Sequence, residues 1–402
     1  MIKIYICPNQ FFTMKKVFFI FVALLSTPIF KAQAQDSGDA NRRVITTGVP
    51  FLAIAADPRA AGMGDQGVAT AADAYSQQWN PSKYAFSLKQ QGVGVTFTPY
   101  LSNLVNDIFL GNLTYYNKIN EQSAFAASFR YFSLGEIEFR ETADDIPLIQ
   151  QPNEFTFDLS YSLKLSDRFA MSVAGRYLRS DLRIPGVGGD DATAAGSFGV
   201  DISGFYQSEQ KPMGSFDGRW RGGFNFSNIG GKIKYDDAGQ ENFIPTNMRL
   251  GGGFDFILDE YNKISTTLEL SKLLVPTPQD FDGDGDIDAD DDAEYNSIGA
   301  FEGIFKSFGD APDGFSEELK EFTWSLGAEY VYQDVFALRA GYFNESEEKG
   351  ARKFLTLGAG FKYTIINIDI SYLFSTSKIR SPLENTLRFG LSFNFGDDYQ
   401  EY

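Results

Sequence analysis

Apolar and polar residues alternate along most of the chain beyond residue 90. From Phe155 to Leu165 every odd position is apolar and every even position is polar, and the alternation recurs over 324–332 and 387–395. Successive side chains of a β-strand point to opposite faces, so each run predicts a strand with one apolar and one polar face. Beyond residue 35 the sequence has no long uninterrupted apolar run of the kind that makes a membrane-spanning helix.

Followed along the whole chain, the alternation predicts about 14 strands. Most are about 10–13 residues long, which matches tilted strands that cross a bilayer rather than the roughly 5–6 residues of an ordinary strand. The predicted strands lie near 91–98, 107–117, 121–133, 154–165, 168–180, 197–208, 218–228, 245–257, 262–273, 322–332, 335–344, 353–363, 366–376 and 384–395.

The connections between these strands alternate between short and long. Short turns fall at Ser166-Asp167, Gln333-Asp334 and Thr364-Ile365, and the long loops are 134–153, 181–196, 229–244 and 274–321. An even strand count with short periplasmic turns and long external loops is typical of bacterial outer-membrane barrels. We therefore expect an all-β fold, a transmembrane antiparallel β-barrel over 91–396 in the cell outer membrane, with both termini and a tail at 397–402 in the periplasm.

The first residues form an export signal rather than part of the fold. Lys15 and Lys16 precede a short apolar run, and an Ala-Gln-Ala pattern ends at Ala34. A charged start, an apolar middle and a small-residue exit predict a cleaved signal peptide over 1–34, with Met14 as an alternative start. The apolar run falls short of the ~20 residues that a membrane anchor needs.

Residues 35–90 do not alternate and are rich in small residues. Two arrangements fit such a segment ahead of the first strand. It could be a loose periplasmic tail, or it could fold inside the barrel as a hatch, since large barrels are commonly plugged by chain.

The amino-acid composition excludes several classes of function. The chain has no histidine, which excludes His-based acid–base catalysis and His-ligated zinc or haem. The only cysteine, Cys7, lies in the predicted signal peptide. A net charge of −18 argues against a nucleic-acid partner, because phosphate binding needs clustered Lys and Arg. We expect a protein that is not an enzyme.

One acidic segment in the last long loop predicts a metal site. It matches the calcium-loop template, with carboxylates at positions 1, 3 and 5, glycine at 6 and an acid at 12. The predicted ligands are Asp280, Asp282, Asp284, Asp286, Asp288 and Asp291. The twelfth position is Asp rather than Glu, and no helices are evident on its flanks. We expect Ca²⁺ in a structural role; a solvated acidic loop is the alternative.

Two further patterns have structural interpretations. Gly251-Gly252-Gly253 does not join a strand to a helix, so we interpret it as a bend or a close backbone approach rather than a phosphate cradle. The aromatic residues near strand ends predict interfacial girdles. They include Tyr100, Tyr115, Tyr116, Tyr131, Phe132, Trp220, Tyr235, Trp324, Tyr332 and Tyr342.

Four motifs in the N-terminal segment resemble one family. They are Phe51-Leu-Ala-Ile54, Asp57-Pro-Arg-Ala-Ala-Gly-Met-Gly64, Asp73-Ala74 and Trp79-Asn80-Pro81. This set is similar to the N-terminal signature of PorV, the outer-membrane barrel family of the type IX secretion system. That family lies within the FadL-like barrel superfamily, whose members carry a similar Asn-Pro hatch. The resemblance covers essentially the whole mature chain.

The resemblance implies a function in protein secretion. Such proteins bind a SprA-like translocon, accept secreted cargo through its C-terminal domain, and deliver it to a PorU-like sortase complex. The candidate binding loops are 134–153, 229–244 and 274–321, and outer-membrane lipid surrounds the barrel. The alternative is a FadL-like channel for hydrophobic small molecules. A shuttle predicts a blocked lumen and exposed apolar patches on the loops, whereas a channel predicts a continuous apolar pocket behind the hatch. A lipid-modifying enzyme is a third hypothesis, which the lack of histidine disfavours.

Overall fold

The computed structural model describes most of the chain beyond residue 42. The described residues are 43–101, 105, 107–140, 146–182, 193–235, 241–283, 287, 291–377, 384 and 386–399. The predicted signal peptide and the predicted tail beyond Tyr399 lie outside these ranges.

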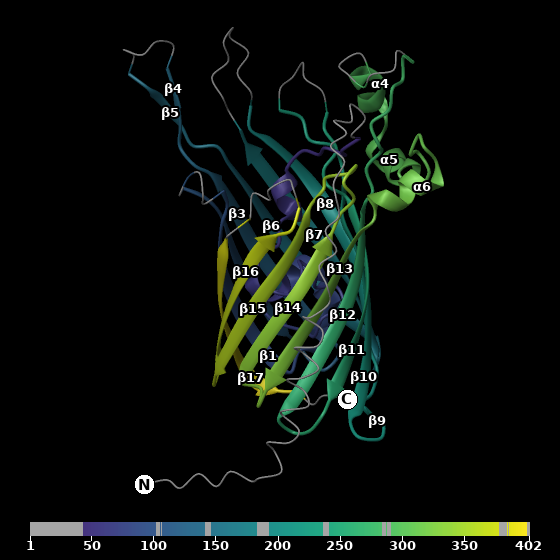
Figure 1. Cartoon of the computed structure of the whole chain (residues 1–402). Helices are drawn as coiled ribbons and strands as arrows, with labels where there is room; N and C mark the ends of the chain where they lie inside the picture. The colour runs from purple at the N-terminus through teal and green to yellow at the C-terminus, as the bar shows by residue number, and fades with distance from the viewer. Residues whose placement is uncertain are drawn as a thin grey trace. The chain divides into compact units, whose positions relative to one another are not determined.

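Fourteen strands form one closed antiparallel barrel in which each strand pairs with the strands before and after it, and β1 pairs with β17 (Figure 1). All the predicted strands are confirmed, and no end differs from its prediction by more than three residues. The barrel strands are β1 (Lys89–Pro99), β2 (Ile108–Lys118), β3 (Ser123–Leu134), β6 (Asn153–Ser166), β7 (Phe169–Asp181), β8 (Ala195–Gln207), β10 (Asp217–Gly230), β11 (Asn247–Ile257), β12 (Asn262–Leu273), β13 (Thr323–Tyr332), β14 (Phe336–Asn344), β15 (Lys353–Tyr363), β16 (Ile366–Ser375) and β17 (Leu387–Asp398).

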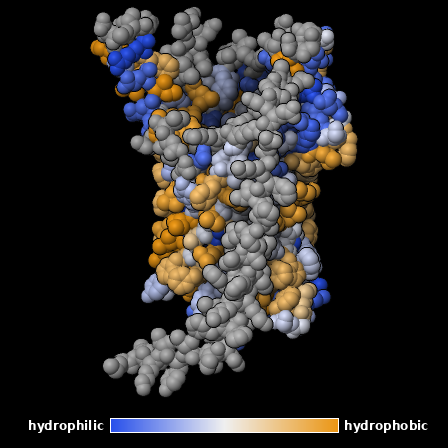
Figure 2. Space-filling view, viewed as in Figure 1, coloured by the Kyte–Doolittle hydropathy of each residue, from blue (hydrophilic) through white to orange (hydrophobic). Residues whose placement is uncertain are grey.

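The wall has the inverted polarity of a membrane barrel. On β6, Phe157 and Leu159 are 51% and 55% exposed on the outer face, whereas Asp158 between them is 1% exposed on the lumen side. Hydrophobic residues cover much of the outer wall in Figure 2. An outer apolar band over a polar interior is stable only against lipid, so the barrel is an outer-membrane protein.

The two ends of the barrel differ in the length of their connections. At one end, the turn end, β6 and β7 are joined by two residues, as are β15 and β16. A two-residue strand β9 (Lys211–Pro212) lies in the connection between β8 and β10 at the same end. The opposite end, the loop end, carries the long connections (Figure 1). The predicted alternation of short and long connections is therefore present.

Two loops at the loop end contain secondary structure. The connection from β3 to β6 forms a small hairpin, β4 (Ile137–Phe139) and β5 (Leu148–Gln150). The connection from β12 to β13 contains α4 (Asp292–Ser297), α5 (Ala300–Lys306), α6 (Phe315–Glu318) and η3 (Leu319–Glu321). No helix among the described residues is long and apolar enough to cross a membrane.

Residues 43–88, which we call the hatch, begin at the loop end, where Arg43 pairs with Glu317 of α6 at 2.9 Å, and continue into the lumen. Thr96 of β1 donates to the Ala56 carbonyl, and Glu269 of β12 accepts from the Gly67 amide. These strands belong to different parts of the ring, so a segment that contacts both inner faces lies between them. The hatch contains η1 (Pro50–Ala53), α2 (Pro58–Ala61), α3 (Ser76–Trp79) and η2 (Pro81–Phe86). Of the two arrangements that fit the sequence, the structure has the plug.

The girdle interpretation is wrong for at least four aromatic residues, since Tyr100 and Tyr235 pack against the same buried cluster as Phe132. Trp220, Trp324 and Tyr332 are exposed on the outer wall. Tyr116 and Phe132 instead face the lumen and are buried. They pack there against the hatch and belong to the interior of the plugged barrel.

Candidate functional site

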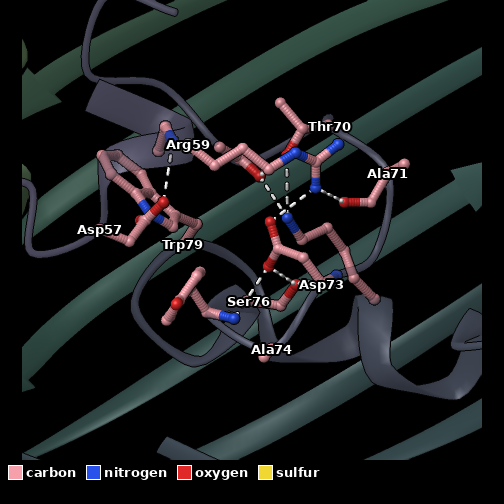
Figure 3. Close-up of polar contacts among 12 residues, drawn as sticks. Asp57, Arg59, Thr70, Ala71, Asp73, Ala74, Ser76 and Trp79 are labelled. Atoms are coloured by element: carbon pink, nitrogen blue, oxygen red, sulfur yellow. Dashed lines mark hydrogen bonds and ion pairs between the residues drawn. The ribbon is translucent and has the colours of Figure 1, made fainter. Parts of the chain in front are cut away.

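The carboxylate of Asp57 connects two of the hatch motifs, residues 57–64 and residues 79–81. Asp57 caps α2, and its Oδ1 accepts a hydrogen bond from the Ala60 amide at 2.8 Å. Its Oδ2 accepts from Trp79 Nε1 at 2.7 Å (Figure 3). An aspartate at the N-cap satisfies an otherwise free helix amide, and here its second oxygen also fixes the ring of the Trp-Asn-Pro motif. Asp57 and Trp79 are both buried.

Arg59 fastens this motif to the barrel wall. Its Nε and Nη2 donate to the two carboxylate oxygens of Glu329 on β13, at 3.0 and 2.9 Å. Its Nη1 donates to Asp73 of the hatch at 2.6 Å (Figure 3). Glu329 also accepts from Arg339 at 2.6 Å, and Arg339 donates to Asp369 at 2.6 Å. The result is a buried line of alternating charges across three wall strands, with a bidentate Arg–carboxylate pair at its hatch end.

Further contacts anchor the hatch around the ring. One oxygen of Glu269 on β12 accepts from the amides of Gly67 and Val68, both at 2.9 Å. Arg388 on β17, which is 1% exposed, pairs with Asp65 at 2.9 Å. Together with Arg59, these contacts attach the hatch to strands in several parts of the barrel.

The Trp-Asn-Pro motif is fixed through its main-chain and amide groups. Asn80 Nδ2 donates to the Val68 carbonyl in the hatch and to the Gly204 carbonyl on β8, each at 2.9 Å. In return, Asn225 on β10 donates to the Trp79 carbonyl at 2.8 Å. A side chain with two donors can bridge two carbonyls, which explains asparagine at this position.

Several glycines allow the hatch and wall backbones to approach. Gly64 has a φ of +85°, and a Cβ there would lie 2.9 Å from the Tyr342 carbonyl oxygen. On the wall, a Cβ on Gly251 would lie 2.5 Å from Val68 Cγ1, and one on Gly223 would lie 2.3 Å from the Val68 carbonyl oxygen. In the Gly251–Gly253 run, the wall backbone at Gly251 lies close to the hatch, but its neighbour there is the Val68 side chain rather than another backbone.

Burial shifts the ionisation of the hatch. Burial raises the pKa of Asp57 to about 6, and the negative charge of Asp73 adds to the rise. Burial lowers the pKa of Lys83 to about 8, against the attraction of Asp73. Lys83 donates to the Gly67 carbonyl at 2.8 Å and to Thr70 at 3.0 Å, so its ammonium is paired within the hatch.

Neither of two described cavities is an apolar chamber in the lumen. One, of about 350 Å³, lies at the turn end beside the hatch, and its lining mixes charged side chains such as Arg59 and Asp369 with apolar ones. The other, of about 460 Å³, is almost wholly apolar, but it lies on the outer wall between Tyr206, Leu250 and Leu268.

The acidic loop brings together three of its six predicted ligands. Carboxylate oxygens of Asp280, Asp282 and Asp291 lie within 4.8 Å of one another. Asp291 is buried and accepts from the amides of Phe281 and Asp282, at 2.6 and 3.2 Å. Asp284, Asp286 and Asp288 lie outside the described residues. Three hard oxygen donors fit part of a calcium shell, which takes 6–8 oxygens, so the calcium site stays a prediction.

A second acidic group was not predicted from the sequence. Asp310, Glu318 and Glu321 have carboxylate oxygens within 4.8 Å of one another. Lys272 lies against this group and pairs with Glu318 at 2.8 Å and with Glu321. Two of the three carboxylates are therefore already paired with a buried lysine, which binds α6 to β12.

The three predicted binding loops differ in what they expose. The hairpin β4–β5 in 134–153 exposes Ile137, Leu148 and Ile149. In 229–244, Ile233 and Phe243 are instead buried and pack against the rest of the protein. The 274–321 loop exposes large apolar side chains on α5 and α6.

Comparisons with known proteins agree with this architecture. A family model described as "Type IX secretion system protein PorV" matches residues 37–280. No curated protein matches the sequence. Among solved structures, the Pseudomonas putida toluene transporter TodX is 11% identical, with 83% of this chain and 95% of that chain covered and a TM-score of 0.50. The CymD monoaromatic hydrocarbon channel is 12% identical, with 86% and 99% covered and a TM-score of 0.50.

A Pseudomonas aeruginosa FadL homologue is also similar, at 11% identity, 85% and 98% coverage and a TM-score of 0.43. At such identities a structural likeness shows the fold alone, which is the barrel fold that this chain shares with TodX and CymD. The family model covers more than half of the chain. The protein therefore belongs to the PorV family of type IX secretion system proteins.

Proposed function

We propose that this secretion component is a docking protein rather than a channel or an enzyme. It binds the C-terminal domain of secreted cargo at a SprA-like translocon and passes that cargo to a PorU-like sortase complex. The observation that carries the proposal is that neither described cavity is an apolar chamber behind the hatch, which is attached to the wall by buried ion pairs.

The hatch contacts argue against passage through the lumen. A path through the lumen would open only if the hatch moved. That movement would separate Arg59 from Glu329 and Asp65 from Arg388. Removing one partner of a buried pair typically costs about 3–5 kcal/mol. The turn-end cavity is lined by charged as well as apolar groups, whereas pockets for apolar molecules are mostly apolar.

The loop end offers a surface for a protein partner. The hairpin β4–β5 extends away from the barrel (Figure 1). Ile146 is 94% exposed, and Leu148 and Ile149 are each 50% exposed. An exposed two-stranded edge with apolar side chains suits a partner that adds a strand of its own. Long loops of such barrels face the exterior, so we place this hairpin where cargo emerges and the C-terminal end of β17, at the turn end, in the periplasm.

Affinity purification from native membranes tests the proposal. We expect the protein to recover a very large barrel together with secreted proteins that share one C-terminal domain. The double variant Leu148→Ser, Ile149→Ser should recover less cargo, while Val105→Ser, another exposed apolar loop residue, should recover the same amount. Equal recovery by both variants would remove the hairpin from the proposal.

The second candidate is a channel for hydrophobic small molecules, suggested by the likeness in fold to the toluene transporter TodX. A deletion strain separates the two functions. Loss of secretion with unchanged uptake of an apolar compound supports docking. Normal secretion with lost uptake contradicts it.

A further inference from the structure

Two short helices at the loop end present apolar side chains outward. On α5, Phe301 is 64% exposed and Phe305 is 79% exposed. On α6 and the adjoining η3, Phe315 is 76% exposed and Leu319 is 54% exposed. Spacings of four residues put each pair on one helix face. We call these four residues and Phe308, which is 49% exposed, the aromatic patch.

The opposite face of α6 and η3 is charged and buried. Lys349 pairs with Glu317 at 2.7 Å and with Glu321 at 3.0 Å. Lys272 pairs with Glu318 at 2.8 Å and also with Glu321. Because these acids are bound to lysines beneath the helix, Phe315 and Leu319 have to point away from the protein. The orientation of the patch is thus set by ion pairs.

This polarity is the reverse of that of a helix that faces water. A water-exposed helix buries its apolar stripe and exposes its charged one. The neighbouring α4 follows that rule, since Asp292 and Glu294 are exposed and Tyr295 packs against Phe243. The reversed arrangement of α6 matches the barrel wall, where charges face inward and apolar groups face lipid. One loop therefore contains a helix suited to water and another suited to an apolar medium.

The patch also continues the lipid-facing wall. Leu319 precedes Trp324 by five residues, and Trp324 and Leu326 are 37% and 53% exposed on the outer face of β13. In Figure 1, α5 and α6 lie beside the loop ends of the strands and below α4, and Figure 2 shows hydrophobic surface both there and on the wall beneath. The β4–β5 hairpin extends beyond this level.

We propose that α5, α6 and η3 form a membrane-binding platform whose aromatic patch inserts into the outer leaflet beside the barrel. The ligand is the acyl region of a lipid surface. Aromatic and leucine side chains over a charged face are what interfacial helices use to bind lipid. The platform would hold the 274–322 loop against the membrane and leave the β4–β5 hairpin free in solvent.

Single-cysteine labelling tests this inference, because Cys7 is the only cysteine of the chain. In a Cys7→Ser background, the variants Phe305→Cys, Phe315→Cys and, as a control on α4, Glu294→Cys are labelled with the fluorophore NBD. Each full chain is reconstituted into phosphatidylcholine nanodiscs with or without phosphatidylcholine that carries a doxyl quencher near the top of its acyl chain. Heat-modifiable migration on gels verifies that each variant is folded.

We expect the doxyl lipid to quench the labels at 305 and 315 several-fold more than the label at 294. Aqueous iodide should show the opposite order. Labels at 305 and 315 that resemble the one at 294 in both experiments would overturn the proposal. Protection of these sites only in native membranes, and not in nanodiscs, would also overturn it and would assign the patch to a protein partner.

Discussion

Glu329 links the hatch to the wall, because it pairs with Arg59 of the hatch and with Arg339 of the wall. We expect Glu329→Gln to loosen the hatch by about 3–5 kcal/mol, since two buried guanidinium groups lose their shared carboxylate. Hydrogen exchange of residues 55–65, followed by mass spectrometry in nanodiscs, measures the change.

The matched control is Glu209→Gln. Glu209 pairs with Arg168 in an exposed salt bridge at the turn end, where such pairs contribute about 0–1 kcal/mol. Unchanged exchange in both variants would mean that the Arg59–Glu329 pair does not hold the hatch.

Because of Asp57, we expect the stability of the hatch inside the barrel to depend on pH. Its pKa is about 6 in the fold against an ordinary value of 3.8, so the folded hatch binds more protons between these two values. The hatch should therefore become less stable as pH rises from about 4 to about 6, with little further change up to pH 7.5. The pKa of Asp73 is lowered, and that of Lys83 is about 8, so neither titrates within this window.

Hydrogen exchange of the hatch, corrected for the intrinsic pH dependence of the rates, checks this expectation. Asp57→Asn carries no titrating group at this position and should lose the slope between pH 4 and 6. A slope of the same size in the variant would assign the effect to another group.

The sequence alone identified the hatch motifs, but it could not identify their partners on the wall. Arg59 and Glu329 are 270 residues apart, and Gly67 and Glu269 are 202 residues apart. In the sequence these acids look like any other polar residue on the lumen side of a strand. Their role depends on which strand lies opposite which hatch residue, and the period of a strand carries no such information.

At the scale of elements, the strands were predictable because an apolar wall and a polar lumen impose a period of two over many residues. The same rule failed for Tyr116 and Phe132, whose side chains face the lumen. Tyr116 stacks on Tyr84 of the hatch at 4.8 Å, and Phe132 stacks on Phe51 at 5.8 Å. A plug supplies apolar surface inside the barrel, so inward aromatic residues become stable. Three-residue strands such as β4 and β5 are too short to show any period.

The acidic loop leads to a prediction of its own. If Asp280, Asp282 and Asp291 contribute to a calcium site, added Ca²⁺ should protect residues 274–299 from proteolysis, and a chelator should remove that protection. At a concentration of 100 times the dissociation constant, binding would stabilise the loop by ~2.7 kcal/mol. Calorimetric titration measures the affinity, and we expect Asp282→Asn to weaken it.

Glu294→Gln is the control, since Glu294 is an exposed acid in the same loop. If Ca²⁺ binds neither the wild-type chain nor the variants, the segment is a solvated acidic loop. In that case Asp291 serves as an acceptor for backbone amides, among them those of Phe281 and Asp282.

At the scale of the whole molecule, the barrel and its hatch depend on each other. The described lumen face carries many buried charges, and the hatch supplies partners such as Arg59, Asp65 and the amides of Gly67 and Val68. A barrel with so polar an interior would take up water if the hatch left. The hatch has short helices of four to six residues and would not be expected to fold outside the barrel.

Planar-bilayer conductance tests this dependence directly. The wild-type chain should conduct little, because the hatch fills the lumen and its ion pairs keep it there. Deletion of residues 43–88 should open a large, steady conductance, since a 14-stranded ring without a plug is wide enough to hold water. Glu329→Gln should give brief openings between these limits.

If the wild-type chain conducts as freely as the deletion variant, the lumen is an open path and the docking function loses its main support. If it stays closed while the deletion opens, the protein works from its surface, and secretion assays on the loop variants become the decisive measurement.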